Sequence, residues 1–275
     1  MPYQGRPTSE ATIPMHWSGP AIILSMSAHG ENGAIVRVMT AENGLMAGYV
    51  RGGSGRRLRP VLVPGNHVKI DWRTRVESQL GHMTVELAHS AAPLMLGPRL
   101  ATALLGWATA LTAAALPERQ PYPAIHEALS TLLTIMEMSP DQHAWAATLV
   151  RYELILLGEL GFGLDLTHCA ATGTTDDLTY VSPKSSQAVC REAGLPYAPR
   201  LLPLPAFLLP GGLAAGEWPD WPEIADGLKL TGHFLDRDVL IGRVQSLWEA
   251  RHRVESIVSR ERKENNSSGA VADPL

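Results

Sequence analysis

Hydrophobic and polar positions follow two different periods along this chain. Between residues 17 and 89 they alternate in short runs separated by glycine turns. The alternation is clearest where Val68, Ile70 and Trp72 share one face of a segment and charged residues occupy the other. A period of two is typical of half-buried β-strands, so this part of the chain is predicted to form strands.

We expect five strands in this region, at residues 21–26, 34–40, 45–50, 67–76 and 81–88. Asn43 and Gly44 both tolerate positive φ, which favours a hairpin between the second and third strands. Five short strands with no helix between them fit a small closed barrel. The five-stranded form is an OB-type barrel, whose usual ligands are oligonucleotides, and an SH3-like barrel is the structural alternative.

Beyond Pro93 and Pro98 the period changes to about 3.6, which predicts helices. They are expected at residues 99–115, 124–138, 139–160, 221–234 and 238–262. Turn residues, both cysteines and a strand-like run at residues 178–181 interrupt this pattern.

The predicted fold class is therefore α+β with two domains. An OB-type barrel occupies residues 15–92, and a helical domain occupies residues 93–264 with a small insert at about residues 165–200. Residues 1–14 and 265–275 are expected to be a disordered leader and tail, because they are polar and aperiodic.

The charge of the chain is unevenly distributed. The 275 residues have a net charge of −4 at pH 7, yet the first 92 contain nine Lys or Arg and six Asp or Glu, against fourteen and twenty-one in the remainder. This asymmetry indicates an N-terminal unit that binds polyanions. The first residues lack the apolar core of a signal peptide, and residues 100–117 are too rich in Ala and Thr for a membrane span. We therefore expect a soluble cytoplasmic protein.

Positive charge is concentrated between residues 51 and 75, where seven basic residues accompany one acid, Asp71. Arginine forks match phosphate oxygens, and the glycines among them allow backbone amides to approach closely. Tyr49 is the aromatic best placed for base stacking, whereas Trp72 is expected to fill the core first. The predicted polyanion contacts are Arg37, Tyr49, Arg51, Arg56, Arg57, Arg59, Lys69, Arg73 and Arg75.

Two other interpretations of the charged segments stay open. The stretch from residue 51 could be a solvated arginine-rich loop. The last predicted helix also carries arginines and is a second candidate surface, but its interleaved glutamates favour a solvated face.

No catalytic or metal motif emerges from the sequence. His29 and Glu31 could form an acid–base pair, but they lie in a turn without a third partner. Cys169 and Cys190 each begin a Cys-x-x-Cys spacing whose second position is Thr172 or Ala193 instead. Two thiols do not complete a tetrahedral zinc site, so we predict no cofactor; His168 is the nearest further ligand. The sequence therefore predicts a protein that is not an enzyme.

Three stretches resemble the RecO family of bacterial DNA repair and recombination mediators. The first runs from Trp17 through the motifs at residues 40–44 and 50–52. The second runs from residue 151 to residue 165 and on to Cys169, and the third comprises residues 180–183 and 200–205. The order and spacing of these stretches carry the resemblance over most of the chain.

The resemblance implies an N-terminal OB-fold, a helical domain and a zinc-finger-like insert, here expected to be metal-free. It also implies non-catalytic binding of single- and double-stranded DNA, annealing of complementary strands, and loading of the recombinase RecA. The implied partners are RecR, in some pathways RecF, and the single-stranded-DNA-binding protein, whose tail would occupy a groove of the helical domain.

Two rival functions are retained from the sequence. In the first, the barrel docks a partner protein and contacts DNA only indirectly. In the second, the chain is an enzyme on nucleic acid, which the missing carboxylate cluster disfavours.

Overall fold

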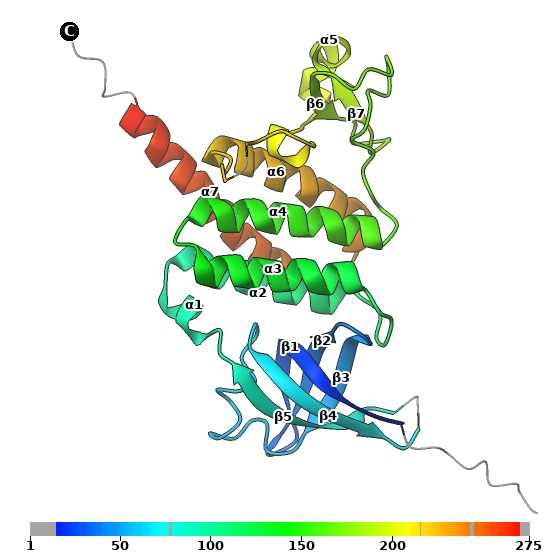
Figure 1. Ribbon diagram of the computed structural model, residues 1–275, viewed down its shortest axis with the longest axis vertical. Helices are drawn as coiled ribbons and strands as arrows, with labels where there is room; N and C mark the ends of the chain where they lie inside the picture. The colour runs from blue at the N-terminus through cyan, green and yellow to red at the C-terminus, as the bar shows by residue number, and fades with distance from the viewer. Residues whose placement is uncertain (1–14, 77–78, 215, 243–244, 270–275) are drawn as a thin grey trace, which may run out of the picture.

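The computed structural model of the chain describes residues 15–76, 79–214, 216–242 and 245–269. The barrel lies at one end of the molecule, a layered helical body occupies the middle, and a small insert lies at the opposite end (Figure 1). The predicted leader at residues 1–14 lies outside the described residues. Within the described chain, no helix combines the length and apolarity needed to cross a bilayer.

The N-terminal barrel is closed, with the strands in the order β1-β2-β3-β5-β4. Four of the five strand pairings are antiparallel, and one is parallel. The strands are β1 (Met15–His29), β2 (Gly33–Thr40), β3 (Gly44–Val50), β4 (His67–Thr74) and β5 (Gly81–His89). The long β1 pairs with β4 through its first half and with β2 through its second half, while β3 and β5 meet in parallel. The prediction of a five-stranded OB-type barrel is confirmed.

Trp72 fills the interior of the barrel, as the alternation in β4 predicts. It is only 4% exposed, and its indole N–H donates to the Ala47 carbonyl at 2.9 Å. A Cβ at Gly48 or Gly81 would collide with the ring or its neighbours, so these glycines make room for it. Trp72 is therefore a core residue and is not available for stacking on a ligand.

Helices of the second domain stack in layers above the barrel (Figure 1). They are α1 (Ala92–Leu96), α2 (Arg99–Ala115), α3 (Pro123–Met138), α4 (Gln142–Glu159), α6 (Trp221–Phe234), the π-helical turn η3 (Leu235–Val239) and α7 (Gln245–Gly269). Asp141 and Asp220 cap α4 and α6 by accepting backbone N–H groups of the first turn. Ile22, Met39 and Leu45 of the barrel join the same hydrophobic core, so the two domains pack against each other.

The insert is a three-stranded sheet with short helical turns. It contains β6 (Leu178–Val181), β7 (Ala188–Cys190), α5 (Arg191–Gly194), η1 (Leu195–Arg200), β8 (Leu202–Pro203) and η2 (Ala206–Leu208), with the strands in the order β7-β6-β8. The strand-like run in the sequence is thus β6, whereas β7 and β8 are too short to give a period.

The C-terminal helix differs from its prediction at both ends. It begins at Gln245 and not at residue 238, because the chain forms a π-helical turn and then reaches Gly242, whose φ of +68° belongs to the left-handed region. It continues to Gly269, past the expected start of the tail at residue 265. Residues 270–275 lie outside the described residues.

A buried ion pair links four helices of the helical body. Glu153 of α4 is 0% exposed and Arg251 of α7 is 1% exposed, and their side chains meet at 3.2 Å. Trp107 of α2 donates its indole N–H to the other oxygen of Glu153 at 2.6 Å, and the Thr231 hydroxyl of α6 donates to the carboxylate as well. Because both charges are removed from water, each depends on the other for compensation.

Close packing holds Arg251 in this position. A Cβ at Gly232 of α6 would lie only 2.5 Å from the guanidinium, so the arginine needs glycine at this turn. Arg251 also donates to the Leu228 carbonyl at 2.6 Å and pairs with Glu255. The network therefore fixes the rotation of α4, α6 and α7 about their axes.

Replacing Glu153 with glutamine tests this network, since the change keeps the size of the side chain and removes its charge. We expect the free energy of unfolding to fall by about 3 kcal/mol, because Arg251 stays buried with one carboxylate fewer. Urea denaturation followed by tryptophan fluorescence measures it. Glu159→Gln, an exposed position on the same helix, is the matched control and should change stability by less than about 0.5 kcal/mol. Equal stability of the two variants would contradict the role of the ion pair.

Candidate nucleic-acid interface

The arginine-rich segment between β3 and β4 is a folded turn that closes one end of the barrel. The Gly55 carbonyl accepts from the backbone N–H groups of Leu58 and Arg59 at 3.2 and 3.0 Å, and the Leu58 carbonyl accepts from Leu62 at 3.0 Å. Leu58, Val61 and Leu62 pack against the barrel core. The segment is therefore anchored by its apolar side chains.

The four arginines of this segment point away from the barrel. Arg51, Arg56, Arg57 and Arg59 are all exposed, and none of them has an ion-pair partner among the described residues. Their full charge is thus presented to solvent. The four arginines lie on one short folded segment, and their role as polyanion contacts stays a prediction.

The cations of β4 are in a different electrostatic state. Lys69 and Arg73 lie on the outer face of the strand, and Arg73 donates to the Asp71 carboxylate at 2.8 Å. Hydrogen bonds from Arg73, and after it from His16, lower the pKa of Asp71 below its usual value. Arg73 is therefore partly neutralised, whereas the exposed Lys69 and Arg75 have no ion pair among the described residues.

Arg37 belongs to the junction of the two domains. Its guanidinium donates to the Ala113 carbonyl in the last turn of α2 at 3.3 Å. A cation at this position satisfies a free carbonyl and complements the helix dipole. The structure thus gives Arg37 a contact with the helical body, which separates it from the loop arginines.

Tyr49 lies half-buried on the outer face of β3, between two histidines. Its ring meets His29 at 6.1 Å and His82 at 5.8 Å, both edge to face. The ring also crosses Gly33, where any Cβ would overlap it. Sequence reasoning missed His82, although the alternation in β5 points it outward, because the parallel pairing of Tyr49 with His82 depends on barrel closure.

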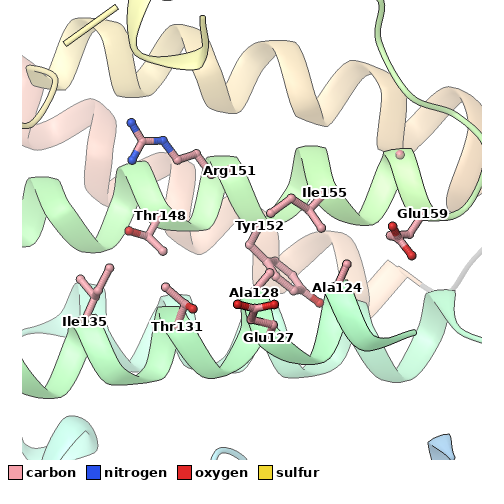
Figure 2. A pocket seen from close by; sticks show the side chains of 11 residues that line it. Ala124, Glu127, Ala128, Thr131, Ile135, Thr148, Arg151, Tyr152, Ile155 and Glu159 are labelled. Atoms are coloured by element: carbon pink, nitrogen blue, oxygen red, sulfur yellow. The ribbon is translucent and has the colours of Figure 1, made fainter. Parts of the chain in front are cut away.

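A groove with a volume of about 560 Å³ lies between α3 and α4 (Figure 2). Small and apolar side chains line it, including Ala124, Ala128, Ile135 and Ile155. Arg151 of α4 stands at its rim, donating to the Phe207 carbonyl at 3.2 Å and lying over the rings of Phe207 and Trp218. The groove therefore combines an apolar floor with one oriented guanidinium at the rim and the carboxylates of Glu127 and Glu159.

The two cysteines of the insert are both buried and form no disulfide. The backbone N–H of Cys190 donates to the Cys169 sulfur at 3.2 Å, and the Thr172 hydroxyl lies 3.6 Å from the Cys190 sulfur. Burial raises the pKa of the Cys169 thiol, but backbone N–H donors and the Thr172 hydroxyl outweigh it and bring the pKa to about 6. Among the described residues, no group of three or more potential ligands could hold a metal ion.

The fold and the site together define an OB-fold protein with a cationic outer surface and a helical body. Two family models match the chain: "Recombination protein O N terminal" over residues 15–91 and "Recombination protein O C terminal" over residues 99–247. The DNA repair protein RecO of Caulobacter vibrioides (strain NA1000 / CB15N) is 48% identical over 227 residues, which cover 82% of this chain and 90% of the relative. The DNA repair protein RecO of Rhodospirillum centenum is 43% identical over 262 residues, covering 94% and 100%.

The chain belongs to the RecO family of DNA repair proteins. This membership confirms the resemblance found in the sequence and supports a role in DNA repair and recombination.

Titration of Cys169 gives a testable consequence for the insert. The pKa of Cys169 in the folded protein, about 6, lies below the ordinary thiol pKa of 9.0, because the hydrogen bonds favour the thiolate. These bonds therefore contribute their full stabilisation at pH values above 9.0, and this stabilisation is lost as the pH falls toward 6. In a Cys190→Ala variant, where Cys169 is the one remaining thiol, ultraviolet thiolate absorbance should rise at about pH 6. A Cys169→Ser, Cys190→Ala variant is the blank. An absorbance rise at the ordinary thiol value would contradict the hydrogen-bonded thiolate.

Proposed function

We propose that this chain is a non-catalytic DNA-binding mediator of repair and recombination. It holds single- and double-stranded DNA by the phosphate backbone, anneals complementary strands, and helps RecR, in some pathways with RecF, to load RecA onto coated single strands. The arginines of the barrel segment carry this proposal, because they are exposed and have no ion-pair partner in the part of the chain that the structure describes, and family membership alone does not assign them a ligand. On this proposal the protein acts on chromosomal DNA in the cytoplasm.

Charge neutralisation supplies the mechanism for annealing. Two DNA strands repel each other through their phosphates, and a cationic surface that holds both reduces this repulsion. Guanidinium forks grip phosphates without reading bases, so the contacts position strands of any sequence. Base pairing then supplies the free energy that joins the strands.

The groove between α3 and α4 is our candidate for the partner tail that the RecO resemblance implies. Its apolar floor suits the side chains of an extended chain end, and Arg151 at the rim suits a carboxylate (Figure 2). The rings of Phe207 and Trp218 hold the guanidinium in place, which lowers the ordering cost of binding. We therefore assign this groove to the tail of the single-stranded-DNA-binding protein.

A protein-interaction adaptor remains the alternative function. In that case the loop arginines would bind acidic side chains of a partner, and the purified chain would not bind DNA. Titration of the purified protein with labelled single-stranded DNA separates the two, since micromolar or tighter binding without a partner requires direct contact.

Replacing Arg56, Arg57 and Arg59 with alanine should weaken DNA binding and slow annealing. Each phosphate contact contributes about −0.7 to the slope of log affinity against log salt for single strands, so three lost contacts should flatten the slope by about 2. Fluorescence anisotropy over a salt series measures it.

The matched control removes the same charge at the other end of the molecule, with Lys184, Arg191 and Arg200 of the exposed insert surface replaced by alanine. Its slope should equal that of the wild type. An equal slope in the loop variant, with the protein still folded, would exclude the barrel segment as the DNA contact.

Replacing Arg151 with glutamine should weaken binding of a peptide that corresponds to the C-terminal tail of the single-stranded-DNA-binding protein. Loss of a charged hydrogen bond is expected to cost about 1.5–3 kcal/mol, which is roughly 10- to 150-fold in affinity. Isothermal titration calorimetry of the wild type and the variant, each with the free-acid and the amidated peptide, gives a double-mutant cycle for the contact between Arg151 and the terminal carboxylate. The amidated peptide should bind both proteins equally weakly; a further loss on the variant would show that Arg151 acts without the carboxylate.

A further inference from the structure

Three rings form a row on the outer face of the barrel beside the arginine segment. Strand closure sets His82 of β5 directly opposite Tyr49 of β3, and His29 at the end of β1 lies opposite Gly33, which the Tyr49 ring crosses. The two imidazoles therefore flank Tyr49, at ring distances of 6.1 and 5.8 Å and interplanar angles of 79° and 87°.

The two histidines differ from the other exposed histidines of the described chain in having no polar partner there. His16 bonds to Asp71 at 2.7 Å, and His89 to Glu137 at 2.9 Å. His29 and His82 are exposed, and the ring that each of them meets among the described residues is that of Tyr49. Their position is thus maintained by ring packing, which leaves their nitrogens and outer surfaces available.

Two cations lie beside this row, one of which is partly neutralised by Asp71. Arg51 follows Tyr49 by two residues and is exposed, and Arg73 is the strand neighbour of His82 across the β4–β5 pair. Flat rings beside a cationic track are the arrangement that binds single strands, because bases stack on the rings while cations follow the phosphates.

Resting on the function proposed above, we infer that His29 and His82 form the base-stacking surface of the barrel and that Tyr49 positions them. Tyr49 itself is half-buried between the two imidazoles and over Gly33, so it offers less free surface than they do. Bases in a duplex are already paired and stacked, so this surface acts only on single strands. The arginines bind both forms, and the imidazoles give the barrel its preference for single strands.

The test compares wild type with a His29→Ala, His82→Ala variant by fluorescence anisotropy, using a labelled oligothymidine and a labelled duplex of equal length. Stacking on aromatic side chains typically contributes 5- to 150-fold per base, so we expect the double variant to lose about tenfold or more on the single strand. Its affinity for the duplex and its salt slope should be unchanged.

Two further variants separate stacking from charge. Phenylalanine at both positions keeps a flat ring without a charge and should retain single-strand affinity, whereas lysine at both positions keeps a charge without a ring and should lose it. Tyr49→Leu should give the same selective loss, because it removes the ring that orients the imidazoles, and Tyr49→Phe should restore binding. His168→Ala, at an exposed position between α4 and β6, is the matched control.

Each outcome has one meaning. If the wild type binds neither DNA form, the proposed function fails. If the wild type binds both DNA forms but the alanine variant loses single-strand and duplex affinity equally, the imidazoles act as cations and the inference is overturned. The same conclusion follows if the lysine variant retains single-strand affinity and the phenylalanine variant loses it. An alanine variant that keeps single-strand affinity overturns it as well, and thermal melting monitored by circular dichroism confirms that each variant is folded.

Discussion

The burial of three apolar side chains in one end of the barrel determines how the chain presents its charge. Leu58, Val61 and Leu62 must leave water, and the backbone bonds from Gly55 and Leu58 wind the segment into a compact turn that allows this. The arginines between them cannot be buried without a partner, so the same turn points them outward. The same sequence pattern therefore anchors the segment through its apolar side chains and exposes its arginines. A flexible arginine loop would expose its arginines without being anchored.

A similar constraint orients the helical body. Glu153 and Arg151 are two residues apart on α4, so they point to different sides of the helix. The buried pair of Glu153 with Arg251 fixes which side faces α2, α6 and α7, and this places Arg151 at the rim of the groove (Figure 2). An apolar replacement of the pair would also hold the helices together, but it would lack the directional contacts that Glu153 makes with Trp107, Thr231 and Arg251.

Local patterns predicted most of the fold, whereas long-range contacts decided the details of the site. Alternation identified all five barrel strands, and the helical period gave the bounds of α2 and α6. The parallel meeting of β3 and β5 joins segments separated by the whole turn and β4, so no local signal placed His82 beside Tyr49. Arg37 likewise depends on where α2 ends in space, and the start of α7 depends on a π-helical turn that hydrophobic periodicity does not register.

On the proposed function, net charge of opposite sign on the two domains would restrict where DNA can lie. Beyond residue 92 acids outnumber Lys and Arg by twenty-one to fourteen, so the helical body repels a polyanion that the barrel attracts. The repulsion acts over about 8–10 Å at physiological salt, so on the proposed function it would disfavour a strand that extends past the domain junction. On the proposed function, Arg151 would hold the carboxylate end in a groove that Glu127 and Glu159 also line, away from the barrel cations that would hold the phosphate backbone.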